Sequence, residues 1–146
     1  MPDIVDPATR SRMMAGIRNR DTRPELVVRS LLHRAGFRFR LHVRDLPGRP
    51  DIVLPRFRAV VVVNGCFWHR HDCPAFRWPG TNVRFWSEKL AKNVERDQRK
   101  LAELRNKGWR TAVVWECAVR NAGTGQALSS ILSVWLRSND RELSIP

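Results

Sequence analysis

The spacing of hydrophobic residues along the chain predicts both helices and strands. After Thr22-Arg23-Pro24-Glu25, a pattern typical of helix starts, hydrophobic residues recur at helical spacing as far as Gly36, which is well suited to end a helix. From Phe37 to Arg44 hydrophobic residues alternate with basic residues and a histidine, which predicts a strand with one exposed basic face. The same criteria predict further strands over 51–54, 59–63 and 109–115, and further helices over 83–107 and 127–136.

The order of these elements predicts an α/β fold. Three strands precede the long helix, one strand follows it, and a final helix ends the pattern. A strand on the far side of a helix usually returns parallel to the sheet by a right-handed crossover. We therefore expect a mixed β-sheet flanked by helices, formed by a single domain over residues 21–146. Residues 1–20 are expected to form a short basic arm, in which a helix starts at Asp6-Pro7.

Composition and charge indicate a nucleic-acid partner. The chain has 146 residues, of which 42% are hydrophobic, enough for the core of one domain. Lys and Arg number 27 against 14 Asp and Glu, so the formal net charge is +13. This excess excludes an acidic ligand-binding surface and favours a polyanion. No hydrophobic run approaches the ~18 residues of a membrane span and no signal-peptide pattern is present, so we expect a cytoplasmic protein without a membrane partner. We expect a monomer because no long hydrophobic seam is left over.

Cysteines and histidines gather in a pattern that suits a metal ion. Cys66, His69, His71 and Cys73 lie within eight residues, and Cys117 follows the last predicted strand. An odd number of cysteines cannot all pair in disulfides, whereas three thiolates and one imidazole form a closed tetrahedral Zn²⁺ site. Such a site would fix the irregular segment 64–82 to the sheet. The spacing does not decide which histidine binds zinc, and the other would be available for acid–base chemistry.

Three carboxylates are candidates for catalysis, and each has a simpler structural explanation. Asp51 opens a predicted strand directly after a Pro-Gly-Arg-Pro turn, where a carboxylate can hold Mg²⁺ or merely favour the turn. Glu25 completes a capping box with Thr22. Asp97 shares a polar stripe of the long helix with Asn93 and Lys89, which a solvated helix face would also explain.

Aromatic residues are candidates for DNA contacts, because six tryptophans are many for a chain of this length. Phe67 and Trp68 lie in the irregular segment, and Trp86 lies at the start of the long helix. In so basic a chain, such aromatics can stack on bases or wedge between base steps. Met14 and Ile17 of the arm could do the same from the minor groove. The tryptophans expected in the core are Trp109, Trp115 and Trp135.

Several short stretches, in order along the chain, carry a resemblance to a known family. They are Ala8-Thr9-Arg10-Ser11, Leu46-Pro47-Gly48-Arg49-Pro50-Asp51, Gly65-Cys66-Phe67-Trp68-His69, Phe85-Trp86, Lys92-Asn93-Val94-Glu95-Arg96-Asp97, Gly108-Trp109-Arg110 and Val114-Trp115-Glu116-Cys117. In this combination the chain resembles the very short patch repair (Vsr) endonucleases. These are bacterial enzymes that nick DNA beside T:G mismatches formed by deamination of 5-methylcytosine.

The resemblance implies a restriction-endonuclease-like fold and a division of roles within the site. Asp51 would bind Mg²⁺ together with the backbone carbonyl of Val63, and His69 would activate the attacking water. Glu25 would support the same centre, and Asp97 would orient a histidine or its water. The zinc ligands that the resemblance implies are Cys66, His71, Cys73 and Cys117.

The resemblance also implies which residues contact DNA. Three aromatic residues would form a wedge inserted at the mismatch from the major groove, namely Phe67, Trp68 and Trp86. Met14 and Ile17 would enter from the minor groove, and Lys89 and Asn93 would read the mismatched pair.

The chain departs from the family at Val63-Asn64, where the family commonly has Thr-His. An asparagine accepts no proton, so Asn64 would occupy a catalytic position without its chemistry, and His69 would act alone. The chain also lacks the Glu-x-Lys that generic nucleases of this fold carry on the strand after Asp51.

The expected function is thus a Mg²⁺-dependent, strand-specific nick on the 5′ side of the T in a T:G mismatch of double-stranded DNA, with Zn²⁺ as a structural ion. The expected setting is the bacterial nucleoid, with general mismatch-repair proteins as candidate partners. Two alternatives stay open. One is a nickase of the same fold for another mismatch or distorted DNA, and the other is a zinc-stabilised DNA-binding protein without catalysis.

Overall fold

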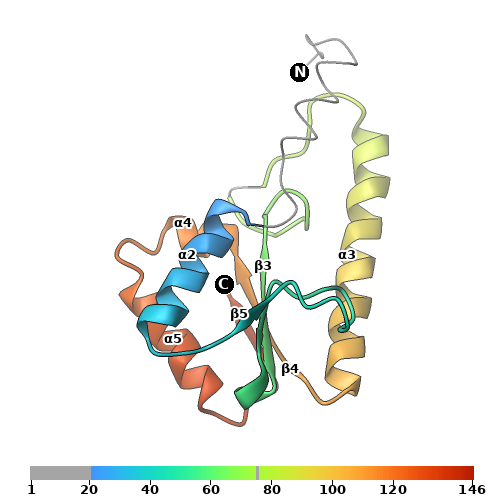
Figure 1. Cartoon of the computed structure of the whole chain (residues 1–146). Helices are drawn as coiled ribbons and strands as arrows, with labels where there is room; N and C mark the ends of the chain where they lie inside the picture. The colour runs from blue at the N-terminus through green and yellow to red at the C-terminus, as the bar shows by residue number, and fades with distance from the viewer. Residues whose placement is uncertain (1–20, 75) are drawn as a thin grey trace.

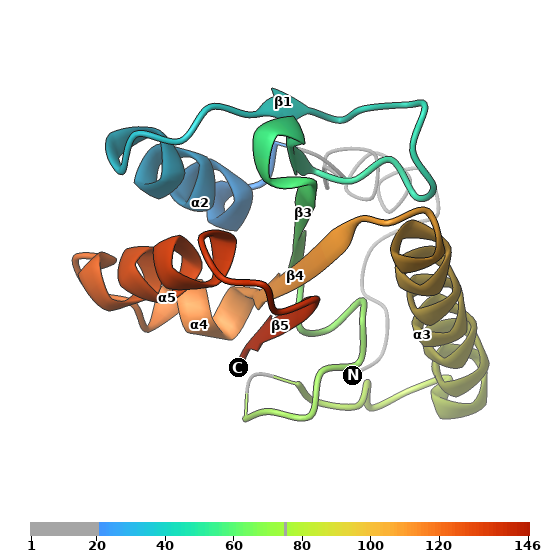
Figure 2. The same cartoon turned by 90° about the horizontal axis from the view of Figure 1, so that it is seen from below.

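A five-stranded mixed β-sheet separates two unequal helical layers (Figure 1 and Figure 2). The fold comes from a computed structural model that describes residues 21–74 and 76–146. The expected arm over 1–20, with Met14 and Ile17, lies outside the described residues. The predicted α/β class, a mixed sheet flanked by helices, is confirmed. Among the described residues, no helix is long and hydrophobic enough to cross a membrane.

The strands lie in the sheet in the order of the chain, β1-β2-β3-β4-β5. The antiparallel strands are β1 (Arg40–Leu41), β2 (Ile52–Leu54) and β3 (Ala59–Asn64), and a short 3-10 helix, η1 (Pro55–Phe57), joins the last two. Two further strands pair in parallel. They are β4 (Arg110–Trp115), which pairs with β3, and β5 (Glu142–Ile145), which pairs with β4. Asn64 lies opposite Trp115, so the parallel strands β3 and β4 end at the same end of the sheet. The predicted zinc ligands follow directly after these two strand ends.

Three helices cover one face of the sheet, namely α2 (Arg23–Arg34), α4 (Glu116–Arg120) and α5 (Gln126–Leu136) (Figure 2). The inward residues of α2 and α5 recur every three or four positions, so each helix buries one hydrophobic stripe. Leu32 and Leu132 are almost fully buried there in one core cluster with Val61 of β3. Because burying a leucine or valine contributes about 1.5–3 kcal/mol, this face supplies most of the hydrophobic stabilisation.

Of the described helices, only α3 (Val83–Asn106) lies on the other face of the sheet (Figure 2). Leu104, near its C-terminal end, packs in a small cluster with Val53 and Val60. Earlier along the helix, polar residues including Asn93 and Asp97 face a cleft instead of a hydrophobic core. Leu90, in the N-terminal half of the helix, is also fully buried, so this polar stretch lies between two buried leucines.

The predicted boundaries agree with the structure to within two residues, except at the first strand. A strand was expected over 37–44, whereas β1 has only two residues. Phe37 is buried in the core, but Leu41 is exposed, and His42 has a left-handed backbone conformation with φ of 48°. Because the chain turns at His42, the strand ends there, although hydrophobic and polar residues continue to alternate in the sequence as far as Arg44. Two short elements, α4 and β5, were not predicted, because five and four residues carry little periodicity.

Candidate active site

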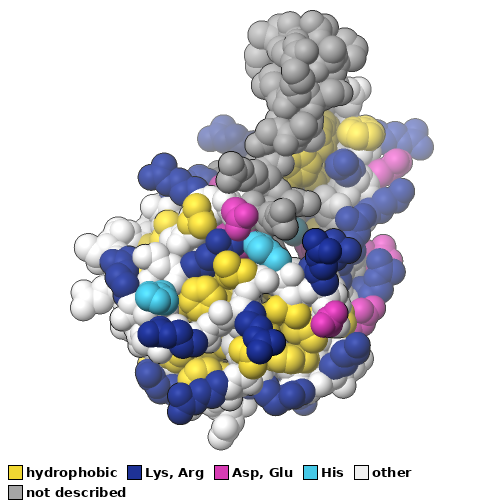
Figure 3. Space-filling view, viewed as in Figure 1, with side chains coloured by type: hydrophobic (Ala, Val, Ile, Leu, Met, Phe, Trp, Pro, Cys, Tyr) yellow, Lys and Arg dark blue, Asp and Glu magenta, His cyan; other side chains and the backbone are white. Residues whose placement is uncertain are grey.

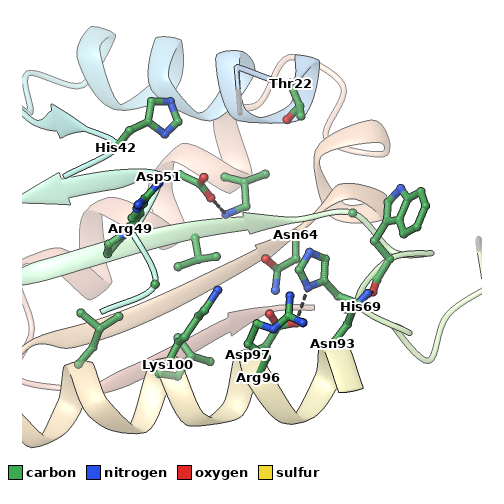
Figure 4. Close-up of a pocket in the computed structure, with 18 of the residues that line it drawn as sticks. Thr22, His42, Arg49, Asp51, Asn64, His69, Asn93, Arg96, Asp97 and Lys100 are labelled. Carbon is green, nitrogen blue, oxygen red and sulfur yellow. Dashed lines mark hydrogen bonds and ion pairs between the residues drawn. The ribbon is translucent and has the colours of Figure 1, made fainter. Parts of the chain in front are cut away.

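A cleft of about 1120 Å³ lies between α3 and the end of the sheet where the chain enters β2 and leaves β3 (Figure 4). Asp51, Asn64, His69 and Asp97 all line this cleft. The structure thus brings together four of the five residues that were expected to serve in catalysis. The fifth, Glu25, is 2% exposed and contacts His42, which does line the cleft.

Asp51 lies directly before β2 and is held by the neighbouring strand. Its Oδ2 accepts a hydrogen bond from the backbone N–H of Val63 at 2.9 Å. Burial raises the pKa of the Asp51 carboxyl to about 6, while the Val63 hydrogen bond lowers it and the charge of Glu25 raises it further. A buried carboxylate whose charge is not fully compensated is suited to bind a cation.

His69 is oriented by α3. Its backbone N–H donates to the carbonyl of Gly65 at 3.2 Å, and its ring Nδ1 pairs with the carboxylate of Asp97 (Figure 4). A carboxylate beside one ring nitrogen favours the proton on that nitrogen and leaves the other as an acceptor. The contact explains why part of the polar stripe of α3 faces inward.

Glu25 forms only half of the predicted capping box. Thr22 Oγ1 accepts from the backbone N–H of Glu25 at 3.4 Å, but the Glu25 carboxylate contacts Arg29 at 2.5 Å and His42 Nε2 at 3.2 Å. Asp21 contacts the same two partners. Asp21, Glu25 and His42 lie close enough to hold a metal ion. However, the Arg29 guanidinium already supplies a cation to both carboxylates, so this cluster does not need one.

The four predicted zinc ligands converge beyond the ends of β3 and β4. Their ligand atoms all lie within 4.8 Å of one another, and the residues are Cys66, His71, Cys73 and Cys117. The Sγ of Cys117 is 3.5 Å from Nδ1 of His71. Two ligands of a tetrahedral zinc ion, at about 2.3 Å for sulfur and about 2.0 Å for nitrogen, are separated by about the same distance.

The backbone of the irregular segment directs the two competing histidines to different partners. The segment is not extended, because the N–H of His71 donates to the carbonyl of Cys66 at 2.9 Å and Arg70 has a φ of 50°. His69 therefore contacts α3 and His71 contacts Cys117. Trp115, which was expected in the core, stacks on the His71 ring with centroids 4.0 Å apart and orients it.

The chemistry of the cysteine cluster fits a metal. Burial raises the pKa of the Cys66 thiol to about 12, and the neighbouring thiols of Cys117 and Cys73 contribute to the increase. The Cys66 thiol is therefore protonated at neutral pH unless a cation replaces the proton. Zinc binds thiolates in this way and releases protons as it does so.

The three predicted wedge residues, Phe67, Trp68 and Trp86, form one aromatic cluster. Their ring centroids are 5.2 to 5.9 Å apart. Asn93 Nδ2 donates to the carbonyl of Trp68 at 3.1 Å, which ties α3 to this cluster. Lys89, one turn before Asn93, is exposed on the same helix. The structure therefore joins the predicted wedge and one predicted base-reading residue in a single unit at the N-terminal half of α3.

Six charged or histidine residues of the cleft were missed by the sequence analysis, namely His42, Arg44, Arg49, Arg96, Lys100 and Glu116. Arg96 and Lys100 continue the polar stripe of α3 at spacings of three and four residues, which was their only signal. Such a stripe cannot be distinguished from a solvated helix face without knowing what packs against it.

Comparison with known proteins identifies the family. The family model described as DNA mismatch endonuclease Vsr matches residues 2–75. The chain is 46% identical over 138 residues to the DNA mismatch endonuclease Vsr of Escherichia coli, covering 93% of this chain and 88% of that protein. The chain belongs to the Vsr family. It is also 50% identical over 127 residues to the type II nicking enzyme V.XorIIP of Xanthomonas oryzae pv. oryzae, covering 87% and 93% of the two chains. The type II nicking enzyme V.NmeAIP of Neisseria meningitidis is 42% identical over 121 residues, covering 83% and 86%.

Membership of the Vsr family makes this protein a DNA endonuclease with a role in DNA nicking and mismatch repair. The surface is consistent with this substrate, because Lys and Arg side chains are spread over the face seen in Figure 3 and outnumber acidic ones. A polyanion is attracted to such a surface before any specific contact forms.

Proposed function

We propose that this Vsr-family protein cuts one strand of double-stranded DNA at a T:G mismatch, on the 5′ side of the T, in a Mg²⁺-dependent reaction. The observation that carries the proposal is that Asp51 and the His69–Asp97 pair line one cleft. A carboxylate for a cation and an imidazole for a proton are the two groups that phosphodiester hydrolysis needs near one phosphate.

Asp51 and the backbone carbonyl of Val63 would hold Mg²⁺. Both are hard oxygen ligands, which magnesium prefers. The N–H of Val63 already faces Asp51, and the N–H and carbonyl of one strand residue face the same neighbouring strand. When bound, Mg²⁺ would offset the negative charge that grows on the phosphate and on the leaving oxygen.

His69 would take the proton of the attacking water through Nε2, because Nδ1 is occupied by Asp97. The water oxygen would bond to phosphorus as the bond from phosphorus to the leaving oxygen breaks. Glu25 would act through its charge and through the Arg29–His42 network beside Asp51, and the buried Asn64 would shape the cleft without exchanging a proton.

Zn²⁺ would be held by Cys66, His71, Cys73 and Cys117 and would act as a structural ion. The support is the convergence of these four ligand atoms at the edge of the sheet, where they join two segments far apart in sequence. The clamp would fix the segment that carries His69 and the aromatic cluster.

The aromatic cluster of Phe67, Trp68 and Trp86 would provide the preference for mismatches. Separating two base pairs costs a few kcal/mol, and less where the pair is already weak. Lys89 and Asn93 would then contact the mismatched pair.

We further propose that the protein acts as a monomer on DNA of the bacterial nucleoid, with mismatch-repair proteins as candidate partners.

A nicking assay tests this function. Duplexes with each mismatch in several flanking sequences are incubated with the protein, with and without Mg²⁺. We expect nicking of the T strand of T:G duplexes only when Mg²⁺ is present. Equal nicking of another mismatch would indicate the alternative specificity.

The binding-only alternative is tested by Asp51→Asn. We expect this variant to keep its affinity for mismatched duplex and to lose nicking. Absence of nicking by the parental protein, together with tight binding, would favour the DNA-binding protein without catalysis.

The zinc proposal is tested by metal analysis of the purified protein. We expect one zinc ion per chain, and loss of zinc in Cys117→Ser. The surface variant Asp72→Ser, in the same segment but outside the ligand set, serves as the control and should retain it.

A further inference from the structure

Two cations of α3 extend toward the cleft without a partner of their own. Arg96 and Lys100 lie one helical turn apart and both line the cleft. Figure 4 shows Lys100 reaching from α3 into the cleft and Arg96 beside Asp97, whereas Asp51 lies on the opposite side. Within residues 21–74 and 76–146, neither side chain forms an ion pair or a hydrogen bond.

The stem of Lys100 is held by the turn that leads to Asp51. Gly48 has a φ of 75°, and a Cβ at this position would lie 2.7 Å from Cδ and 3.1 Å from Cβ of Lys100. The turn thus packs directly against the hydrocarbon part of the side chain. Because Gly48 is only three residues before Asp51, the position of the ammonium is linked to that of the carboxylate.

Carboxylates and cations both line the cleft. Asp51, Asp97 and Glu116 would repel a phosphate that enters, although Asp97 is paired with His69 and Glu116 with Arg120. Arg44 and Arg49 line the cleft from the segment before β2, and Arg96 and Lys100 are the cations that α3 supplies. A guanidinium can bind a phosphate with two parallel hydrogen bonds, and an ammonium acts as a compact point charge.

We propose that Arg96 and Lys100 form a clamp that binds the phosphate to be cut, from the α3 side of the cleft. This inference rests on the proposed nicking function and deepens it by naming the groups that hold the scissile phosphate between Asp51 and His69. The clamp differs from general attraction to DNA because it acts at the reacting phosphate and nowhere else.

The same helix offers a matched control. Lys92 and Arg99 are also one lysine and one arginine of α3, but neither lines the cleft. The pairs Arg96→Gln/Lys100→Gln and Lys92→Gln/Arg99→Gln remove the same two positive charges, so both variants have the same net charge. A difference between them therefore reports position and not total charge.

The experiment measures the single-turnover rate constant of nicking with saturating protein, and the affinity for the same duplex. We expect the cleft pair to lower the rate constant about 100-fold, as removal of a group that stabilises reacting charge does, and the control pair to change it less than about threefold. Equal rate constants for the two pairs would overturn the clamp, as would a defect of the cleft pair confined to affinity. If the parental protein nicks no duplex, the proposed function fails, which is a different result.

Two single variants separate charge from packing at Lys100. Lys100→Met keeps a stem of similar length against Gly48 but removes the ammonium, whereas Lys100→Arg keeps the charge. We expect the methionine variant to be slowed about tenfold with unchanged melting temperature, and the arginine variant to retain most of the rate. A methionine variant that nicks at the parental rate would show that the lysine serves only packing and would contradict the proposal.

Discussion

The two faces of the sheet are built on different principles. Among the residues that the structure describes, fourteen buried ones form one continuous hydrophobic core on the α2/α5 face, whereas the cluster under α3 has three. The remaining surface between α3 and the sheet is a cleft lined by carboxylates, cations and two histidines. One face therefore stabilises the domain, and the other is left free to hold charged groups near each other.

The energetic consequence is visible at Asp51. Its pKa of about 6 means that the folded protein favours the neutral form more than an unfolded chain does. A cation binds only the charged carboxylate of Asp51, and this charge lowers the stability of the folded protein until the cation binds. Residues of the α3 face are expected to change activity when replaced, and those of the α2/α5 face to change stability.

The largest effect is expected for His69→Ala. If this imidazole accepts the proton of water, its loss should slow nicking by about 10²–10⁴-fold, as for other general bases. The rate is measured in single-turnover assays with mismatched duplex and Mg²⁺, and the melting temperature is recorded in parallel.

The control for this variant is His33→Ala, which removes an exposed histidine of α2 outside the cleft. It should nick at the parental rate. A His69→Ala protein that nicks as fast as His33→Ala would remove His69 from the mechanism and leave the α3 face without an assigned base.

The opposite behaviour is expected for Leu132→Ala on α5. Leu132 is fully buried in the large core, so truncation should lower the free energy of unfolding by about 2–5 kcal/mol. The neighbouring Ile131 is 45% exposed, and Ile131→Ala should cost much less. Chemical denaturation measures both, and nicking at a temperature where both are folded should stay near parental. Equal destabilisation by the two variants would contradict the division between faces.

The two faces also differ in how far they follow from the sequence. The α2 and α5 helices were predicted to within a residue, because a one-sided hydrophobic core imposes helical periodicity on leucines such as Leu128 and Leu132. β5 was missed because a strand of four residues at the edge of the sheet shows almost no hydrophobic periodicity. The alternation around His42 was misleading, since a left-handed residue ends the strand early.

At the site, local motifs named the residue types but not their partners. Spacing could not choose between His69 and His71, because the choice depends on the φ of Arg70 and on contacts with Asp97 and Cys117 far along the chain. Lys100 gave no usable signal, since its place is set by packing against a turn more than fifty residues earlier. The assigned catalytic and zinc-binding roles stay predictions for the experiments above.

An intermediate effect on stability is expected for Asp51→Asn without Mg²⁺. The folded pKa is about 6 against 3.8 for the ordinary carboxyl, so the stabilisation from this proton is complete below about pH 4 and is lost as pH rises through 6. The variant should therefore unfold at higher denaturant concentration than the parent at pH 7.5, by up to about 3 kcal/mol. The difference should vanish near pH 4.

Magnesium sharpens this test, because it should stabilise the parent at pH 7.5 and leave Asp51→Asn unchanged. The substitution changes one carboxyl, so the difference reports Asp51 together with its interactions with Glu25, His42 and Arg29. A variant no more stable than the parent at pH 7.5 would mean that this carboxylate is not held at an energetic cost on the α3 face.

The smallest effect is expected at Thr22, which lines the cleft but also caps α2 of the stabilising face. Its Oγ1 accepts the N–H of Glu25 at 3.4 Å, a long hydrogen bond, so Thr22→Ala should cost about 0.5–1 kcal/mol in unfolding free energy. Thr22→Ser keeps the accepting oxygen and should stay within a few tenths of the parent. Because α2 carries Glu25 in its first turn, looser capping would also let the Glu25–His42 contact relax beside Asp51. If Thr22→Ser and Thr22→Ala were equally destabilising, the methyl group of Thr22 and not its hydroxyl cap would be the stabilising contact.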